Sequence, residues 1–143
     1  MNTAILAPAA VLVLWSLIIL FWMAGTRFPA LAKTGANLSD AKPGGRGSDL
    51  EGVIPDKVNW KSHNFTHLME QPTLFYATVI ILAISDAAYG ANLYLAWAYV
   101  IIRIIHSIWQ VTVNLVKVRL VLFVASTICL VILAINAVWA TLF

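Results

Sequence analysis

Four apolar stretches, each long enough to cross a bilayer as a helix, constrain this chain more than any other feature. The hydrocarbon layer of a bilayer is about 30 Å thick and needs about 20 apolar residues to span it as a helix. Such stretches cover residues 3–27, 60–89, 91–114 and 117–143. The chain is 62% hydrophobic and only 10% charged, whereas soluble domains are about 25% charged. It is therefore predicted to be an integral membrane protein.

The links between these stretches predict how the helices are arranged. Two links are short, AYGAN after the second stretch and NLVKVR after the third, while a polar segment at residues 28–59 separates the first two stretches. Short links place successive helices antiparallel. The sequence therefore predicts an all-α membrane protein in which residues 1–143 form a single domain, a four-transmembrane-helix up-down bundle.

Lysine and arginine are unevenly distributed between the links. The polar segment with its flanks holds six of them and the third link holds two, whereas both chain ends and the second link hold none. Because basic residues favour the cytoplasmic side, we expect residues 28–59 to be cytoplasmic and both termini to lie on the opposite side. The formal charge of +3 is scattered and gives no footprint for nucleic acid.

Polar residues inside the second and third stretches predict a site. His63, His67 and Glu70 are spaced by four and three residues, so a helix places them on one face. Such a group could bind a metal, but it lacks the zinc-protease motif. The single cysteine, Cys129, offers no second thiolate, and no metal site is predicted.

The third stretch carries one polar stripe on an otherwise apolar helix, made of Tyr99, Arg103, His106, Gln110 and Asn114. Counted from the cytoplasmic boundary at ~1.5 Å per residue, Glu70 and Arg103 lie roughly 13 and 21 Å deep. Long side chains at these depths can meet, and a buried charge needs a partner. We therefore expect a Glu70–Arg103 ion pair between the two helices, next to which a ligand site can lie.

These features together resemble the MAPEG family, the membrane-associated proteins in eicosanoid and glutathione metabolism. The resemblance rests on the four spans with a long first loop, on ME-Q-P after a polar entry to the second span, and on the R-x-x-H of Arg103 and His106 followed by Arg119. It implies a homotrimer of four-helix subunits that holds glutathione between neighbours near the cytoplasmic face. A divergent, bacterial-type member is implied, which would place the chain in a bacterial inner membrane.

Residue roles follow from the resemblance. It implies that Arg119 supports the glutathione thiolate and that Arg27 is a second helper, because a nearby cation favours the charged form of a thiol. The implied glutathione pocket is formed by His63, His67, Glu70, Arg103, His106 and Gln110. The implied activity is that of a glutathione transferase or peroxidase attacking a lipophilic small molecule that enters from the lipid bilayer.

The second span departs from the family pattern. Members that bind glutathione carry arginines and an asparagine ahead of the glutamate, where this chain has His63, Thr66 and His67. Two glutathione carboxylates would meet fewer guanidinium groups, which are the bidentate partners of carboxylates. A second hypothesis therefore stays open: a non-catalytic subunit or lipid-binding protein of the MAPEG fold that docks into a larger membrane complex.

Overall fold

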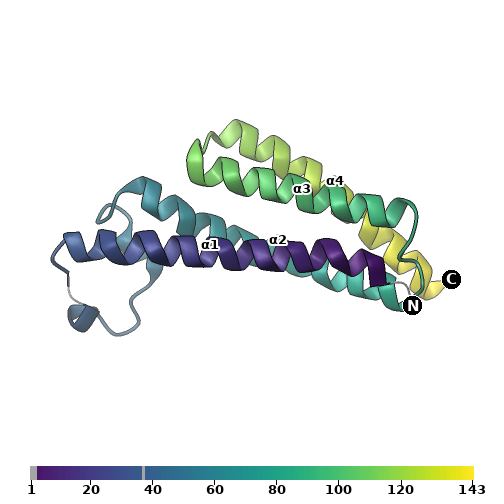
Figure 1. The fold of residues 1–143 in the computed structure, drawn as a ribbon, viewed down its shortest axis with the longest axis horizontal. Helices are drawn as coiled ribbons and strands as arrows, with labels where there is room; N and C mark the ends of the chain where they lie inside the picture. The colour runs from purple at the N-terminus through teal and green to yellow at the C-terminus, as the bar shows by residue number, and fades with distance from the viewer. Residues whose placement is uncertain (1–2, 37) are drawn as a thin grey trace.

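The computed structural model describes residues 3–36 and 38–143, in which four long α-helices carry almost all of the regular structure (Figure 1). The helices are α1 (Leu6–Lys33), α2 (Asp56–Ile84), α3 (Ala91–Thr112) and α4 (Val116–Leu142). Each is long and apolar enough to cross a membrane. The predicted all-α membrane fold with four transmembrane helices is confirmed.

The helices run up and down. In Figure 1, α1 lies along α2 and α3 lies along α4, and α2 also packs against the second pair. Both described chain ends and the α2–α3 link lie at one end of the bundle, here named the terminal end. The loop of residues 34–55 and the α3–α4 link lie at the other, here named the loop end.

Three helix boundaries differ from the prediction by four residues or more: the end of α1, the end of α2, and the start of α2, which lies at Asp56 rather than at residue 60. The first helix continues to Lys33 through Pro29, so the polar loop is shorter than residues 28–59. Proline removes one amide and crowds the carbonyl four residues earlier, which here belongs to the exposed Gly25 near the aqueous end of the helix. The second helix ends at Ile84 rather than at residue 89, because Asp86 adopts φ +56°, which breaks the helical path.

The core and the outer surface are both apolar, as a bilayer requires. Leu12, Ile19, Leu68, Phe75 and Leu133 are no more than 1% exposed between the helices. Large side chains on the outside, among them Phe21, Leu74, Ile84, Tyr94 and Trp139, are between 63% and 76% exposed. In water such a surface would aggregate, but against acyl chains it is the solvated face.

Polar side chains fasten the bundle at three levels. Near the loop end, Ser107 Oγ accepts hydrogen bonds from Asn64 Nδ2 at 2.7 Å and from Trp15 Nε1 at 2.9 Å, which joins α1, α2 and α3. At the middle level, Tyr99, Gln71 and Thr127 form a chain of hydrogen bonds across α3, α2 and α4. At the terminal end, Asn136 Nδ2 donates to Asn92 Oδ1 at 2.7 Å.

Replacing the central hydroxyl of the first link should destabilise the bundle. In Ser107→Ala, the buried donors of Asn64 and Trp15 lose their acceptor, and an unsatisfied buried donor costs about 1–3 kcal/mol. We expect an apparent loss of this size, measured by thermal unfolding in detergent. Thr112→Ala is the matched control, because that hydroxyl is exposed and donates only to Ile108 of its own helix. Equal stability of both variants would show that the hydrogen bonds from Asn64 and Trp15 to Ser107 do not stabilise the bundle.

Candidate functional site

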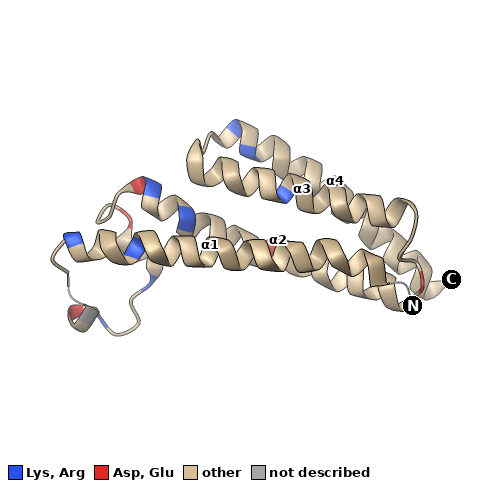
Figure 2. Ribbon diagram, in the orientation of Figure 1, with Lys and Arg blue, Asp and Glu red and all other residues tan. Residues whose placement is uncertain are grey.

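Positive charge is concentrated toward the loop end. In Figure 2 the basic residues lie on the loop, on the ends of the helices next to it and on α3, and the described part of the terminal end shows none. Arg103 lies deeper than the others, nine residues before the end of α3 at Thr112, which is about 13 Å along a helix. It is the cation that most needs an explanation inside a bilayer.

Arg103 is 1% exposed and is held by α2. Its Nη2 donates to the backbone carbonyl oxygen of His67 at 3.0 Å and lies 3.4 Å from the ring Nδ1 of the same residue. Its guanidinium carbon also lies 6.0 Å from the ring centroid of Phe123 on α4, a cation–π distance. Arg103 thus connects α3 with both α2 and α4.

Two histidines complete this part of the bundle. The rings of His67 and His106 are 5.3 Å apart, and the His67 ring meets Phe123 edge to face at 5.6 Å. His106 is 2% exposed, whereas His67 is half-buried. We name His67, Arg103, His106 and Phe123 the central cluster.

Several buried polar atoms on α3 and at the start of α4 have no hydrogen-bond partner among the described residues. They are Arg103 Nε and Nη1, Gln110 Oε1, Trp109 Nε1 and Arg119 Nε. Native proteins pair nearly all such atoms, so a group of orphans deserves an explanation by water, a ligand or a neighbouring chain. Four of the five are N–H donors, and together they suit an anionic ligand with one additional donor for Gln110.

Arg119 stands beside this group at the start of α4. Its Nη1 donates to Asn114 Oδ1 at 2.8 Å. Asn114 adopts φ +57°, a left-handed conformation that asparagine tolerates better than most residues. This turn fixes one nitrogen of Arg119 and leaves Nε buried without a partner among the described residues.

The predicted polar stripe of the third helix is confirmed. Tyr99, Arg103, His106 and Gln110 are each no more than 2% exposed, and Asn114 is half-buried at the helix end. The stripe therefore faces the other helices instead of lipid, as charge inside a bilayer requires.

The predicted Glu70–Arg103 ion pair is wrong. Glu70 is exposed on the outer face of α2, and the only salt bridge within the described residues that meets a 4.0 Å limit joins His63 to Glu51. The pair was predicted from the depths of the two residues alone. Successive residues of a helix are rotated by about 100° around its axis, so residues three apart, such as His67 and Glu70, point in directions about 60° apart. This difference points the His67 backbone, instead of the Glu70 carboxylate, at Arg103.

Two further predicted site residues lie apart from the central cluster. His63 is exposed, and its Nε2 lies 2.9 Å from Glu51 Oε1 in the loop. Arg27 donates from Nη1 to Ser62 Oγ at 3.2 Å and from Nη2 to the carbonyl of Gly47. Within this chain, both residues fasten the loop to the helices.

Sequence reasoning missed Phe123 and the Asn64–Ser107 link. Phe123 is one of many aromatic residues in apolar helices, and nothing in its local sequence marks it as a partner of a buried cation. Asn64 carried a usable signal, because an amide inside a span usually faces another helix and finds a polar partner there.

The fold and the central cluster define a multi-pass α-helical membrane protein whose bundle encloses a cationic, under-satisfied polar site. The chain belongs to the MAPEG family, whose family model matches residues 5–139. Members are membrane-associated proteins of eicosanoid and glutathione metabolism. Comparison with curated proteins and with solved structures gave no match.

Replacing Arg103 should raise stability rather than lower it. The guanidinium is buried with two unpaired nitrogens, and an incompletely paired buried charge is often less favourable than an apolar group of similar size. We expect Arg103→Met to increase apparent stability by about 1–3 kcal/mol in thermal unfolding, as is common where a site is kept for function.

The matched control is Arg46→Met, which removes an exposed arginine from the loop and should leave stability within about 0.5 kcal/mol. A clear loss of stability in Arg103→Met would show that its hydrogen bond to His67 outweighs the cost of burying the charge.

Proposed function

We propose that this protein is a membrane-bound glutathione transferase or peroxidase that acts on lipophilic electrophiles. The observation that carries the proposal is the group of unpaired buried donors around Arg103 and Arg119, together with family membership. Glutathione carries two carboxylates, a thiol and an ammonium group. The orphan nitrogens fit its acceptors, and Gln110 Oε1 fits an N–H donor.

Arg119 has the clearest proposed catalytic role. Its Nη1 is fixed by Asn114, so its free Nε can be held in one direction. Glutathione supplies a sulfur that is nucleophilic as the thiolate. A guanidinium next to that sulfur favours the thiolate, and a neighbouring opposite charge lowers a pKa by about 1–3 units.

The other residues are proposed to bind and position. Arg103 and His106 supply positive potential and a polar wall, and Arg103 holds His67 through its backbone. Glu70 and His63, on the outer side of α2, would contact glutathione across a subunit boundary. Arg27 would act as the second helper only if it releases part of its contact with the loop, so its role is proposed as secondary to that of Arg119.

Glu70 supports a homotrimer. It lies nine residues beyond Lys61 on α2, about 13 Å along the helix. An exposed carboxylate at this depth is costly against hydrocarbon, so a second subunit that covers it would stabilise the protein. The concentration of cations supports a cytoplasmic loop end with both termini on the other side of the membrane, which we propose to be a bacterial inner membrane.

The second candidate function is a non-catalytic MAPEG-fold subunit or lipid-binding protein of a larger membrane complex. One observation favours it: His63 and Arg27 already have partners within the chain, and the His67 carbonyl oxygen accepts a hydrogen bond from Arg103. Residues with internal partners are less available to glutathione.

Glutathione titration separates the two functions. We expect millimolar glutathione to give a thiolate absorbance signal with the purified protein, and Arg119→Ala to lower the conjugation rate about 10- to 1,000-fold, which corresponds to 1–3 pKa units. Lys117→Ala is the matched control, because it removes an exposed cation two residues away. The absence of any binding would rule out the enzyme, and an unchanged thiolate signal in Arg119→Ala would show that another cation acts.

The oligomer is tested at Glu70. If its carboxylate is paired across a subunit boundary, Glu70→Leu should shift the protein from trimer to smaller species in native mass spectrometry. Thr73→Leu, which alters the same exposed face without removing a charge, should leave the trimer intact. A trimer that survives Glu70→Leu would place Glu70 outside the interface, and a monomeric parent protein would overturn the trimer itself.

A further inference from the structure

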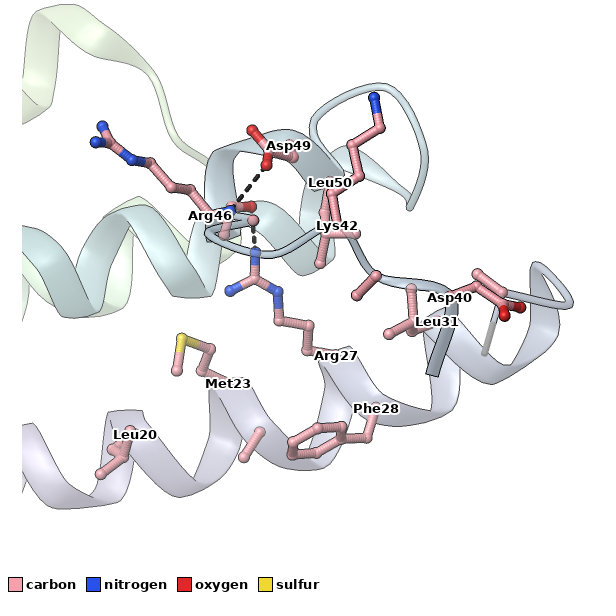
Figure 3. Close-up of a pocket in the computed structure, with 15 residues that line it drawn as sticks. Leu20, Met23, Arg27, Phe28, Leu31, Asp40, Lys42, Arg46, Asp49 and Leu50 are labelled. Carbon is pink, nitrogen blue, oxygen red and sulfur yellow. Dashed lines mark hydrogen bonds between the residues drawn. The ribbon is translucent and has the colours of Figure 1, made fainter. Parts of the chain in front are cut away.

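A cavity of about 820 Å³ lies between the loop end of α1 and the loop of residues 34–55, apart from the central cluster. Figure 3 shows Leu20, Met23, Phe28 and Leu31 along α1, with Arg27 pointing from the helix toward the loop backbone. The volume is within the roughly 300–1,000 Å³ range of small-molecule sites. We name this cavity the interfacial trough.

The trough crosses the level at which a bilayer changes from hydrocarbon to head groups. From Leu6 to Arg27 the helix rises through 21 residues, about 32 Å, which matches the ~30 Å hydrocarbon layer. Leu20 and Met23 therefore lie at acyl-chain depth, whereas Arg27, Lys42 and Arg46 lie at head-group depth. The apolar end of the trough therefore lies at the depth of the lipid acyl chains, and its cationic end lies at the depth of the phosphate groups.

The cationic end of the trough holds side-chain N–H groups that are available to a ligand. The side chains of Lys42 and Arg46 form no salt bridge within the described residues. Arg27 is committed to Ser62 and Gly47 through two nitrogens, but its Nε is buried and has no partner among the described residues. These donors suit an acceptor that enters from the membrane side.

Two carboxylates, Asp40 and Asp49, also line the trough, and both oppose an anion there. Asp49 accepts a hydrogen bond from the Arg46 backbone amide at 2.8 Å, which fixes it in the turn Gly47–Leu50. Asp40 is exposed at the rim. Three cations against two acids leave the head-group end positive.

We propose that the interfacial trough binds an anionic phospholipid of the surrounding leaflet, with an acyl chain along Leu20, Met23 and Ala24 and the phosphate next to Arg27 and Arg46. This binding needs no glutathione and lies within one chain. It therefore goes beyond the proposed enzyme. Arg27 is the residue that both proposals use, so the variants that test the lipid site are made at Arg46 and Ala24 instead.

The test uses the full-length protein in lipid nanodiscs that contain a photoreactive acyl-chain lipid, either phosphatidylglycerol or phosphatidylcholine. Peptide mapping by mass spectrometry compares labelling of trough residues Leu20 and Met23 with that of the outward-facing Leu14 and Phe21. We expect phosphatidylglycerol to be enriched over phosphatidylcholine at the trough and not at the outward residues. Because a basic residue near an anionic membrane surface contributes about 1 kcal/mol, removing one should lower the enrichment about fivefold.

Two variants and one control assign the site. Arg46→Gln should lower the enrichment, while Lys33→Gln, which removes a cation at the same end but outside the trough lining, should not. Ala24→Trp should fill the trough and abolish trough labelling, whereas Gly25→Trp should preserve it, because Gly25 does not line the trough and has open space beside it.

Other outcomes would overturn the proposal. Equal labelling by both lipids, at the trough and outside it, would indicate ordinary boundary lipid. Enrichment of a phosphatidylethanolamine probe above phosphatidylglycerol would assign a zwitterionic head group that uses Asp40. Displacement of the label by glycerol phosphate alone would assign a water-soluble phosphate ester in place of a lipid.

Discussion

The structure depends on how a guanidinium is accommodated between helices in a low-dielectric medium. Among the described residues Arg103 has no carboxylate partner within 4.0 Å, and a backbone carbonyl of α2 and an aromatic face of α4 take that place. A carbonyl is neutral, so the positive charge is held in position without being cancelled. The result is a site with lasting positive potential, which is useful for attracting an anion and unfavourable for stability alone.

The second helix connects the different parts of the molecule. Its inner side supplies Asn64 and Gln71 to the polar links and the His67 carbonyl to the central cluster. Its outer side presents Glu70, and near its start Ser62 accepts a hydrogen bond from Arg27 of α1 while His63 contacts Glu51 of the loop. Anything that moves α2 therefore acts on the core, the cationic site and the loop together, which explains why this helix is less apolar than α1 and α4.

Much of the fold was predictable from the sequence, because helix length, apolar content and link length are local properties. The buried stripe on α3 was predictable for the same reason, since its spacing alone fixes a face. The partner of Arg103 was not predictable from the sequence. It depends on the rotation of α2 about its own axis, because this rotation determines whether the Glu70 carboxylate or the His67 carbonyl faces Arg103. The extension of α1 through Pro29 was missed because proline usually ends a helix, whereas here it lies beyond the apolar stretch. Likewise, the family resemblance implied a catalytic role for Arg27, but its contact with Gly47 depends on a loop whose path no local pattern gives.

The six residues by which α1 outruns its apolar stretch also relate the protein to the thickness of its host membrane. A transmembrane helix meets a thicker or thinner bilayer by tilting or by deforming the bilayer around it. Here the extra turns from Phe28 to Lys33 carry one wall of the trough, and Arg27 marks the boundary level. In a thicker bilayer the head groups would rise along this extension toward Leu31, and in a thinner one they would fall toward Met23. The hydrophobic thickness of the membrane thus sets how much of the trough is immersed.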